Sequence, residues 1–408
     1  MNRSTLKKYA RLIAKVGANV QPGQEVVIHA ELDCPQFVEL LTEACYRLGA
    51  SGVRVEWKHQ PLTPLHIKYR SNSDLARVEP WEVEKLRHRA EKLPARIILL
   101  SEDPDGLAKV DMEKYSRARM AQYPIIKPYR DAAENREQWC IAAVPGERWA
   151  KKMFPQDRRS GAVEKLWEAI LHASRADGPD PEAAWEEHNR TLKEKSNRLN
   201  EIGVERLHYT AGNGTDFTVG FMENGLFLGG DEKTLGGVVF QPNIPSEEVF
   251  TTPKRGLAEG VVYVSKPYSY QGCLIEGIRL VFREGKVVEC SADTNEELLR
   301  RMISMDEGAS YLGECALVPY HSPISESGLL YYNTLFDENA ACHIALGMGF
   351  VNCVRNFDSF TLEECRAMGV NDSMIHEDLM IGTPDMNITA YTRRGEEIPV
   401  FRNGDWAL

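Results

Sequence analysis

The last third of the chain places histidines beside carboxylates, a combination that binds divalent metal ions. In segment 375–378, His376 and Asp378 are two residues apart. On a β-strand both side chains would project from the same face, and Glu377 would point away. A solvated polar turn is the alternative, and the spacing by itself leaves both interpretations open.

A second histidine, His343, follows the acidic pair Asp337 and Glu338 and opens an apolar stretch that ends at a glycine. A histidine beside apolar residues is more often a hydrogen-bonded core residue than a ligand, so this pattern also leaves two interpretations. Two glutamates have glycine or proline nearby, Glu248 in PSEEVF and Glu314 in LGEC. Taken alone, either would be an ordinary surface or turn glutamate.

Together these side chains would suit the hydrolysis of a peptide bond. That reaction needs an activated water molecule and stabilisation of the oxyanion that develops, and a pair of divalent metal ions can supply both. Histidine nitrogens and carboxylates are the ligands expected for zinc-like ions.

A cysteine nucleophile, Cys342 or Cys315, is an alternative. Cys342 and His343 are adjacent in the sequence, and adjacent side chains on a helix do not face each other. Nucleophile and base normally converge from distant segments. Sensitivity to iodoacetamide combined with indifference to chelators would favour this alternative.

The first half of the chain alternates helical and strand patterns. Its short apolar runs, separated by helices, are typical of a buried parallel sheet; they lie at 25–30, 53–57, 96–100 and 140–144. Asp33 is predicted to cap a helix that ends at Gly49. Two later helices are predicted, one around 163–171 and one from Asp180 to about 202, and the second would connect two domains.

The second half has more strand patterns and many glycine turns, so it is predicted to be mixed α+β. Strand-like segments occur at 207–210, 217–221, 261–265, 273–282 and 286–290. Glu284-Gly285 is predicted to form a hairpin turn, and Thr294 with Glu297 a capping box. The predicted fold is therefore α/β, with an N-terminal α/β domain and a mainly parallel sheet at 1–185, and a C-terminal α+β metal-binding catalytic domain at 186–408.

Composition excludes several classes of function. The 408 residues are 43% hydrophobic and 27% charged with a net charge of -11, and charges of both signs are mixed along the chain. A nucleic-acid binder should show a basic face, and no phosphate-binding glycine loop follows any predicted strand. Nine cysteines without a C-x-x-C pair favour a reduced, cytoplasmic setting. No signal peptide or membrane span is expected.

Five segments recur in the same order in a known family: GNGTDFTVGF at 212–221, NIPSEEVFTTP at 243–253, DEGASYLGECALVP at 306–319, NTLFDENAACHIALG at 333–347 and IHEDLMIG at 375–382. They resemble the metallo-aminopeptidases that include aminopeptidase T, aminopeptidase S and PepS. The N-terminal helix, the PGQ turn and the following strand also look similar, so the resemblance covers essentially the whole chain.

The resemblance implies a metal-dependent aminopeptidase that acts on peptides with a free N-terminus. It implies two divalent ions per chain, Zn²⁺ or Co²⁺, while the residue types also admit Mn²⁺. The ligands that it implies are Glu248, Glu314, His343, His376 and Asp378, with Glu338 as an additional or supporting ligand. Glu314 would also serve as general base. The resemblance further implies a homodimer whose N-terminal domains help to cover the active-site cavity.

Phe350 departs from the family pattern. Seven residues after the corresponding histidine, relatives carry a catalytic tyrosine, and this chain has a phenylalanine without the hydroxyl. The loss of one such hydrogen-bond donor typically costs about 10²–10³ in rate. Tyr331 or Tyr332 could supply a hydroxyl from elsewhere. The alternative is a pseudoenzyme that binds metal and peptide without cleaving it. A smaller departure is Glu247, where the family usually has a small residue.

Overall fold

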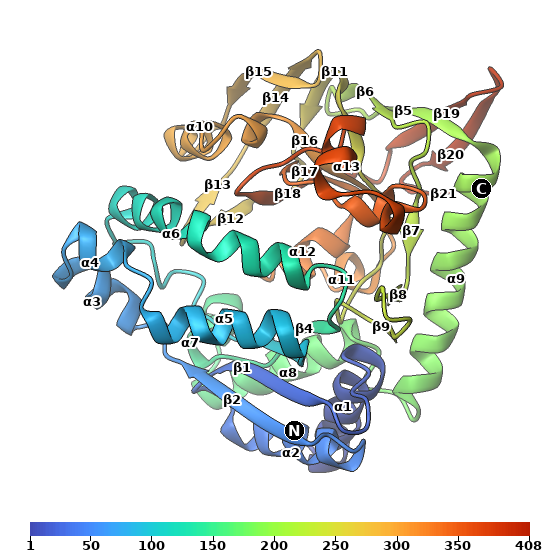
Figure 1. Ribbon diagram of the computed structural model, residues 1–408. Helices are drawn as coiled ribbons and strands as arrows, with labels where there is room; N and C mark the ends of the chain where they lie inside the picture. The colour runs from blue at the N-terminus through green and yellow to red at the C-terminus, as the bar shows by residue number, and fades with distance from the viewer. The chain divides into compact units, whose positions relative to one another are not determined.

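The computed structural model describes residues 1–408, which form two compact units (Figure 1). The first unit contains residues 1–187 and 231–245, and the second contains 188–230 and 246–408. Helix α9 (Pro181–Ile202) contributes to both. The division into domains at 185/186 stays a prediction, and the segment 231–245 shows that the chain returns to the first unit after leaving it.

The first unit is built on a four-stranded parallel sheet of order β2-β1-β3-β4. Its strands are β1 (Glu25–Glu31), β2 (Gly52–Lys58), β3 (Ala95–Leu100) and β4 (Trp139–Ala143). All four coincide with the apolar runs of the sequence, so the predicted parallel sheet is confirmed. A short pair completes the unit, β8 (Glu232–Lys233) with β9 (Val239–Phe240).

Helices account for most of the remaining first unit. They are α1 (Arg3–Leu12), followed by the π-helical turn η1 (Ile13–Gly17), α2 (Pro35–Arg47), α3 (Leu62–Tyr69), α4 (Asn72–Ala76), α5 (Pro80–Lys92), α6 (Met112–Ala133), α7 (Glu147–Met153) and α8 (Arg159–Ala173). The predicted cap of α2 is wrong. Cys34 takes the cap position without a side-chain bond, because the Asp33 carboxylate instead accepts the Ser101 hydroxyl at 3.0 Å.

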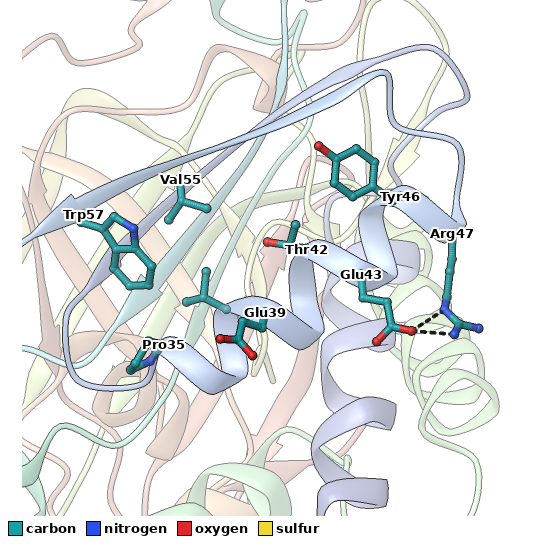
Figure 2. A pocket seen from close by; sticks show the side chains of 9 residues that line it. Pro35, Glu39, Thr42, Glu43, Tyr46, Arg47, Val55 and Trp57 are labelled. Carbon is teal, nitrogen blue, oxygen red and sulfur yellow. Dashed lines mark hydrogen bonds and ion pairs between the residues drawn. The ribbon is translucent and has the colours of Figure 1, made fainter.

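A hollow of about 670 Å³ lies on the first unit where α2 faces β2 (Figure 2). Tyr46 and Trp57, two of its lining side chains, are exposed. At one end Nε and Nη2 of Arg47 both donate to Oε1 of Glu43. None of the candidate metal ligands lines this hollow.

The second unit contains two large antiparallel sheets. The eight-stranded sheet has the order β15-β14-β11-β6-β5-β19-β20-β21, and the five-stranded sheet has the order β18-β17-β16-β10-β7. The first contains β5 (Val204–Thr210), β6 (Asp216–Phe221), β11 (Pro253–Tyr263), β14 (Arg279–Arg283), β15 (Lys286–Ser291), β19 (Asn387–Thr392), β20 (Glu397–Arg402) and β21 (Asp405–Trp406). One cluster of buried apolar side chains takes residues from both sheets, including Phe217, Ile344 and Leu379.

The five-stranded sheet is the one that bears on function. Its strands are β7 (Leu228–Gly229), β10 (Val249–Thr251), β16 (Leu312–Leu317), β17 (His343–Gly347) and β18 (His376–Met380). The helices of this unit are short: α10 (Glu296–Ile303), α11 (Pro323–Glu326), α12 (Thr334–Asp337) and α13 (Leu362–Met368), with single 3₁₀ turns η2 (Gly308–Ser310), η3 (Glu338–Ala340), η4 (Val351–Cys353) and η5 (Phe357–Ser359).

Two predictions for the second unit need correction. The predicted strand 273–282 is two strands, because β13 (Cys273–Ile275) pairs with β12 (Tyr268–Tyr270) whereas β14 joins the large sheet. The capping box does not form, because the Thr294 hydroxyl accepts the N–H of Glu276 and donates to the carbonyl of Leu274.

The hairpin turn is confirmed, since Glu284 and Gly285 join β14 to β15 and both have positive φ. No helix of the protein is long and apolar enough to span a membrane.

Candidate metal centre

The candidate ligands come from neighbouring strands of the five-stranded sheet. Glu314 lies opposite Ala345, and Ala345 lies opposite Asp378, so one row crosses β16, β17 and β18. Residues that are directly opposite in an antiparallel ladder share a face of the sheet. The small side chain of Ala345 therefore leaves the space between the two carboxylates open.

The two histidines extend the same face. His343 lies opposite Ala316, two residues from Glu314, and His376 lies opposite Gly347. A side chain is excluded at Gly347, where φ is +107° and a Cβ would approach the carbonyl oxygen of Ile375 to 2.1 Å. Of the two interpretations left open for segment 375–378, the structure has the strand, which begins at His376, and His376 and Asp378 project from one face of it.

The structure brings the five principal candidates together in two overlapping groups. The ligand atoms of Glu248, Glu314 and His343 lie within 4.8 Å of one another, and so do those of Glu314, His376 and Asp378. Nε2 of His343 is 3.2 Å from Oε2 of Glu248. Nε2 of His376 is 3.1 Å from Oε2 of Glu314 and 3.4 Å from Oδ1 of Asp378. Glu314 belongs to both groups.

An unsatisfied oxygen shows that these residues fit a cation. Oδ1 of Asp378 is buried and accepts no hydrogen bond, a costly state for a carboxylate in the interior. Asp378 is 6% exposed, so water has little access to its carboxylate. A set of two imidazole nitrogens and buried carboxylates suits Zn²⁺, Co²⁺ or Mn²⁺.

Backbone carbonyls orient the imidazole rings. Nδ1 of His376 lies 2.7 Å from the carbonyl oxygen of Met348, so Nδ1–H donates there and Nε2 is turned toward Glu314 and Asp378. Nδ1 of His343 lies 3.4 Å from the carbonyl oxygen of Ala341 in a looser version of the same arrangement. Such a second hydrogen bond is the usual way in which a protein fixes a metal-binding histidine.

Protons compete for the same atoms. Burial lowers the pKa of His343, but the hydrogen bond and charge of Glu248 outweigh burial and raise the pKa to about 9. Burial, with the charge of Glu248, raises the pKa of Glu314 to about 7. A divalent cation that takes Nε2 of His343 must therefore displace a proton at neutral pH.

Glu338 also reaches this centre, although it belongs to neither group of three. It lies in η3, directly after α12, and is hydrogen-bonded to Asp378. Burial and the charges of Asp378, Glu248 and Glu314 raise the pKa of Glu338 well above its usual value. The neighbouring Asp337 has a different task, because its carboxylate accepts the N–H groups of Tyr331 and Asn333 and closes the preceding loop.

Phe350 borders the centre. The centroid of its ring is 4.9 Å from that of His376 and 5.5 Å from that of Phe250. The position at which the resemblance implies a hydroxyl therefore lies beside a candidate ligand. Tyr331 does not replace it, because its ring stacks on Phe336 at 4.6 Å and its hydroxyl is hydrogen-bonded to Ser327.

The buried thiols do not support a cysteine nucleophile. Burial raises the pKa of both Cys315 and Cys342 to about 12, so the reactive thiolate is scarce at neutral pH. The hydroxyl of Tyr209 lies 2.7 Å from Sγ of Cys315. The side chains of Cys315 and Cys342 lie in the apolar core of the second unit.

Comparison with known proteins identifies the family. The model of the thermophilic metalloprotease family (M29) matches residues 2–406. Aminopeptidase 2 of Geobacillus stearothermophilus is 40% identical over 411 residues, which cover 100% of this chain and 99% of that protein. Aminopeptidase T of Thermus thermophilus is 40% identical over 407 residues, with 100% and 99% covered. Aminopeptidase PepS of Streptococcus thermophilus is 38% identical over 408 residues, with 100% and 98% covered.

A solved structure agrees with these relatives. Wild-type AmpT from Thermus thermophilus matches with a TM-score of 0.90 and 38% identity over 100% of both chains. The match confirms the α/β fold class, and the relatives confirm the resemblance and, at the level of the family, the expected class of metallo-aminopeptidase. The chain belongs to the thermophilic metalloprotease family M29.

Proposed function

We propose that the chain is an aminopeptidase that removes N-terminal residues from peptides with the help of two divalent metal ions. The observation that carries the proposal is the pair of ligand groups that share Glu314. Relatives about 40% identical over the full chain are named aminopeptidases, which supports the choice of substrate.

Each candidate ligand has its own role in the proposed reaction. Glu248 and His343 would hold one ion, His376 and Asp378 would hold the other, and Glu314 belongs to both ligand groups. When bound, such ions supply positive charge that polarises a carbonyl and acidifies water. The Glu314 carboxylate accepts the proton of the attacking water as general base, and Glu338 supports Asp378 through their hydrogen bond.

The restriction to N-termini follows from the chemistry of a free amine. An uncharged N-terminal amine offers a lone pair to a metal ion, whereas an acetylated one does not. An internal peptide bond offers no such amine, so the centre favours exopeptidase action.

A peptide with a free N-terminus and the same peptide with an acetylated N-terminus test this specificity. With metal-loaded protein we expect release of the first residue from the free peptide and no release from the blocked one, measured by chromatography of the products. Internal cleavage of both peptides at similar rates would contradict an aminopeptidase.

A second candidate function rests on Phe350. Without the family hydroxyl beside His376, the centre could hold metal and peptide and leave the bond intact. Binding of the free peptide without release of any residue would favour this pseudoenzyme. We further propose that the ions are Zn²⁺ or Co²⁺, with Mn²⁺ admitted by the ligands, and that the protein is a cytoplasmic homodimer that binds no nucleic acid or membrane.

A further inference from the structure

Glu248 is the one principal candidate ligand that lies outside a β-strand. It immediately precedes β10, whose ladder contacts with β16 and β7 begin at Val249. The other principal ligands, in contrast, belong to β16, β17 or β18 and have partners in the ladder, although His343 and His376 are the first residues of their strands. Ser246, Glu247 and Glu248 are nevertheless buried. Contacts other than the sheet must therefore fix this segment.

One of these contacts comes from Asn339, the residue after Glu338. Its Oδ1 accepts the backbone N–H of Glu247 at 2.6 Å. Its Nδ2 donates to the carbonyl oxygen of Leu335 at 2.9 Å and to Oε1 of Glu338 at 3.4 Å. Asn339 has no exposed surface, so no water can replace these bonds. Its amide links the segment that carries Glu248 to the turn that carries Glu338.

His188, on α9, supplies the opposite contact. Its Nε2 lies 2.7 Å from the carbonyl oxygen of Ser246 and 3.7 Å from Oε2 of Glu247. The carbonyl of Ser246 and the N–H of Glu247 belong to the same peptide group. That peptide plane is therefore held from both sides, by a donor at its oxygen and an acceptor at its nitrogen. Such a clamp fixes the direction in which the chain enters Glu248.

We infer that Asn339 and His188 are positioning residues, which place the Glu248 carboxylate by clamping the Ser246–Glu247 peptide group. Neither acts on substrate. The inference rests on the proposed two-metal centre and adds residues to it. The inference also assigns a contact to Glu247, which is larger than the residue that the resemblance implies at this position. Its carboxylate lies near His188, one of the two clamping residues. The expected consequence is selective: the ion held by Glu248 and His343 depends on the clamp, and the ion held by His376 and Asp378 does not.

The test is a calorimetric titration of metal-stripped protein with Co²⁺. Asn339→Leu and His188→Leu are each expected to weaken one of two binding steps by about 10–100-fold, the usual cost of losing a group that orients a ligand. The affected step should be the one that Glu248→Gln weakens and not the one that Asp378→Asn weakens. His188→Gln keeps an N–H donor for the carbonyl of Ser246 and should restore most of the loss.

Asn200→Leu is the matched control. The Asn200 amide also bonds two backbone groups, the N–H and the carbonyl of Phe227, but Phe227 is not a candidate ligand. We expect this variant to lose stability and to keep both Co²⁺ affinities. Unchanged affinities in Asn339→Leu and His188→Leu, or equal weakening of both steps, would overturn the positioning role. If Asn339→Leu fails to fold, the Co²⁺ affinities of His188→Leu and His188→Gln decide whether the positioning role holds. Wild-type protein that binds no Co²⁺ would instead refute the proposed function.

Discussion

Replacing Glu314 with glutamine is expected to lower kcat for N-terminal release by about 10²–10⁴-fold, the range attributed to a positioned general base. Glutamine has nearly the same shape, but it carries no negative charge and cannot accept the proton of the attacking water. The same change removes the carboxylate that both ligand groups share. Initial rates at saturating peptide and saturating Co²⁺ measure the effect and separate it from weaker metal binding.

Glu377→Gln is the control for this prediction. Glu377 is another glutamate of the same sheet. It is half-buried and lies between His376 and Asp378 in the sequence, but its carboxylate accepts the hydroxyl of Tyr268. Glutamine can still accept that hydroxyl, so we expect the rate to stay within a few-fold of wild type. A Glu314→Gln variant that retains more than a tenth of the wild-type kcat would show that another group accepts the proton.

Replacing Phe350 with tyrosine is expected to raise kcat by about 10²–10³-fold, the effect typical of one hydrogen-bond donor to an oxyanion. The ring already lies against that of His376. Phe350 is partly exposed, so an added hydroxyl need not be buried without a partner. Rates for wild-type and variant protein with the same peptide measure the gain.

Phe350→Leu separates the hydroxyl from the ring. It removes the aromatic contacts with His376 and Phe250 and adds no donor, so we expect no gain in rate. If Phe350→Tyr also gives no gain, another group already supplies the electrostatic stabilisation. An inactive wild type with an active Phe350→Tyr variant would support the pseudoenzyme.

The sequence predicts the parts of the fold that local patterns determine. The four apolar runs of the first unit become β1 to β4, because strands of a parallel sheet that alternate with helices are rich in apolar side chains. The edge strand β2 nevertheless has no buried residue. The Asp180-Pro181 start of α9 is correct because the Asp180 carboxylate accepts the N–H of Ala183 at 3.2 Å. Helix α6 gives no such signal, since Pro124 and Pro128 lie inside it. Segment 231–245 joins the first unit through distant bonds, such as those from Gln241 N–H to the carbonyls of Val16 and Gly17.

The same limit applies to the candidate metal centre. The two-residue spacing of His376 and Asp378 predicts a common face because side chains alternate along a strand. The row from Glu314 through Ala345 to Asp378 depends on the register between three strands, which no local pattern specifies. Asn339 and Glu247 are 92 residues apart in the sequence. The carbonyl of Met348 that orients His376 is a backbone group, so the residue types in the sequence do not predict this contact.

Metal dependence is tested most directly by adding Co²⁺ in steps to metal-stripped protein while the release of N-terminal residues from a free peptide is measured. We expect no release from the stripped protein, because Glu314 alone cannot make water sufficiently nucleophilic at neutral pH. Release should then rise and level off at about two ions per chain, one for each ligand group. Full release without added metal, or a plateau at one ion, would contradict the two-metal centre.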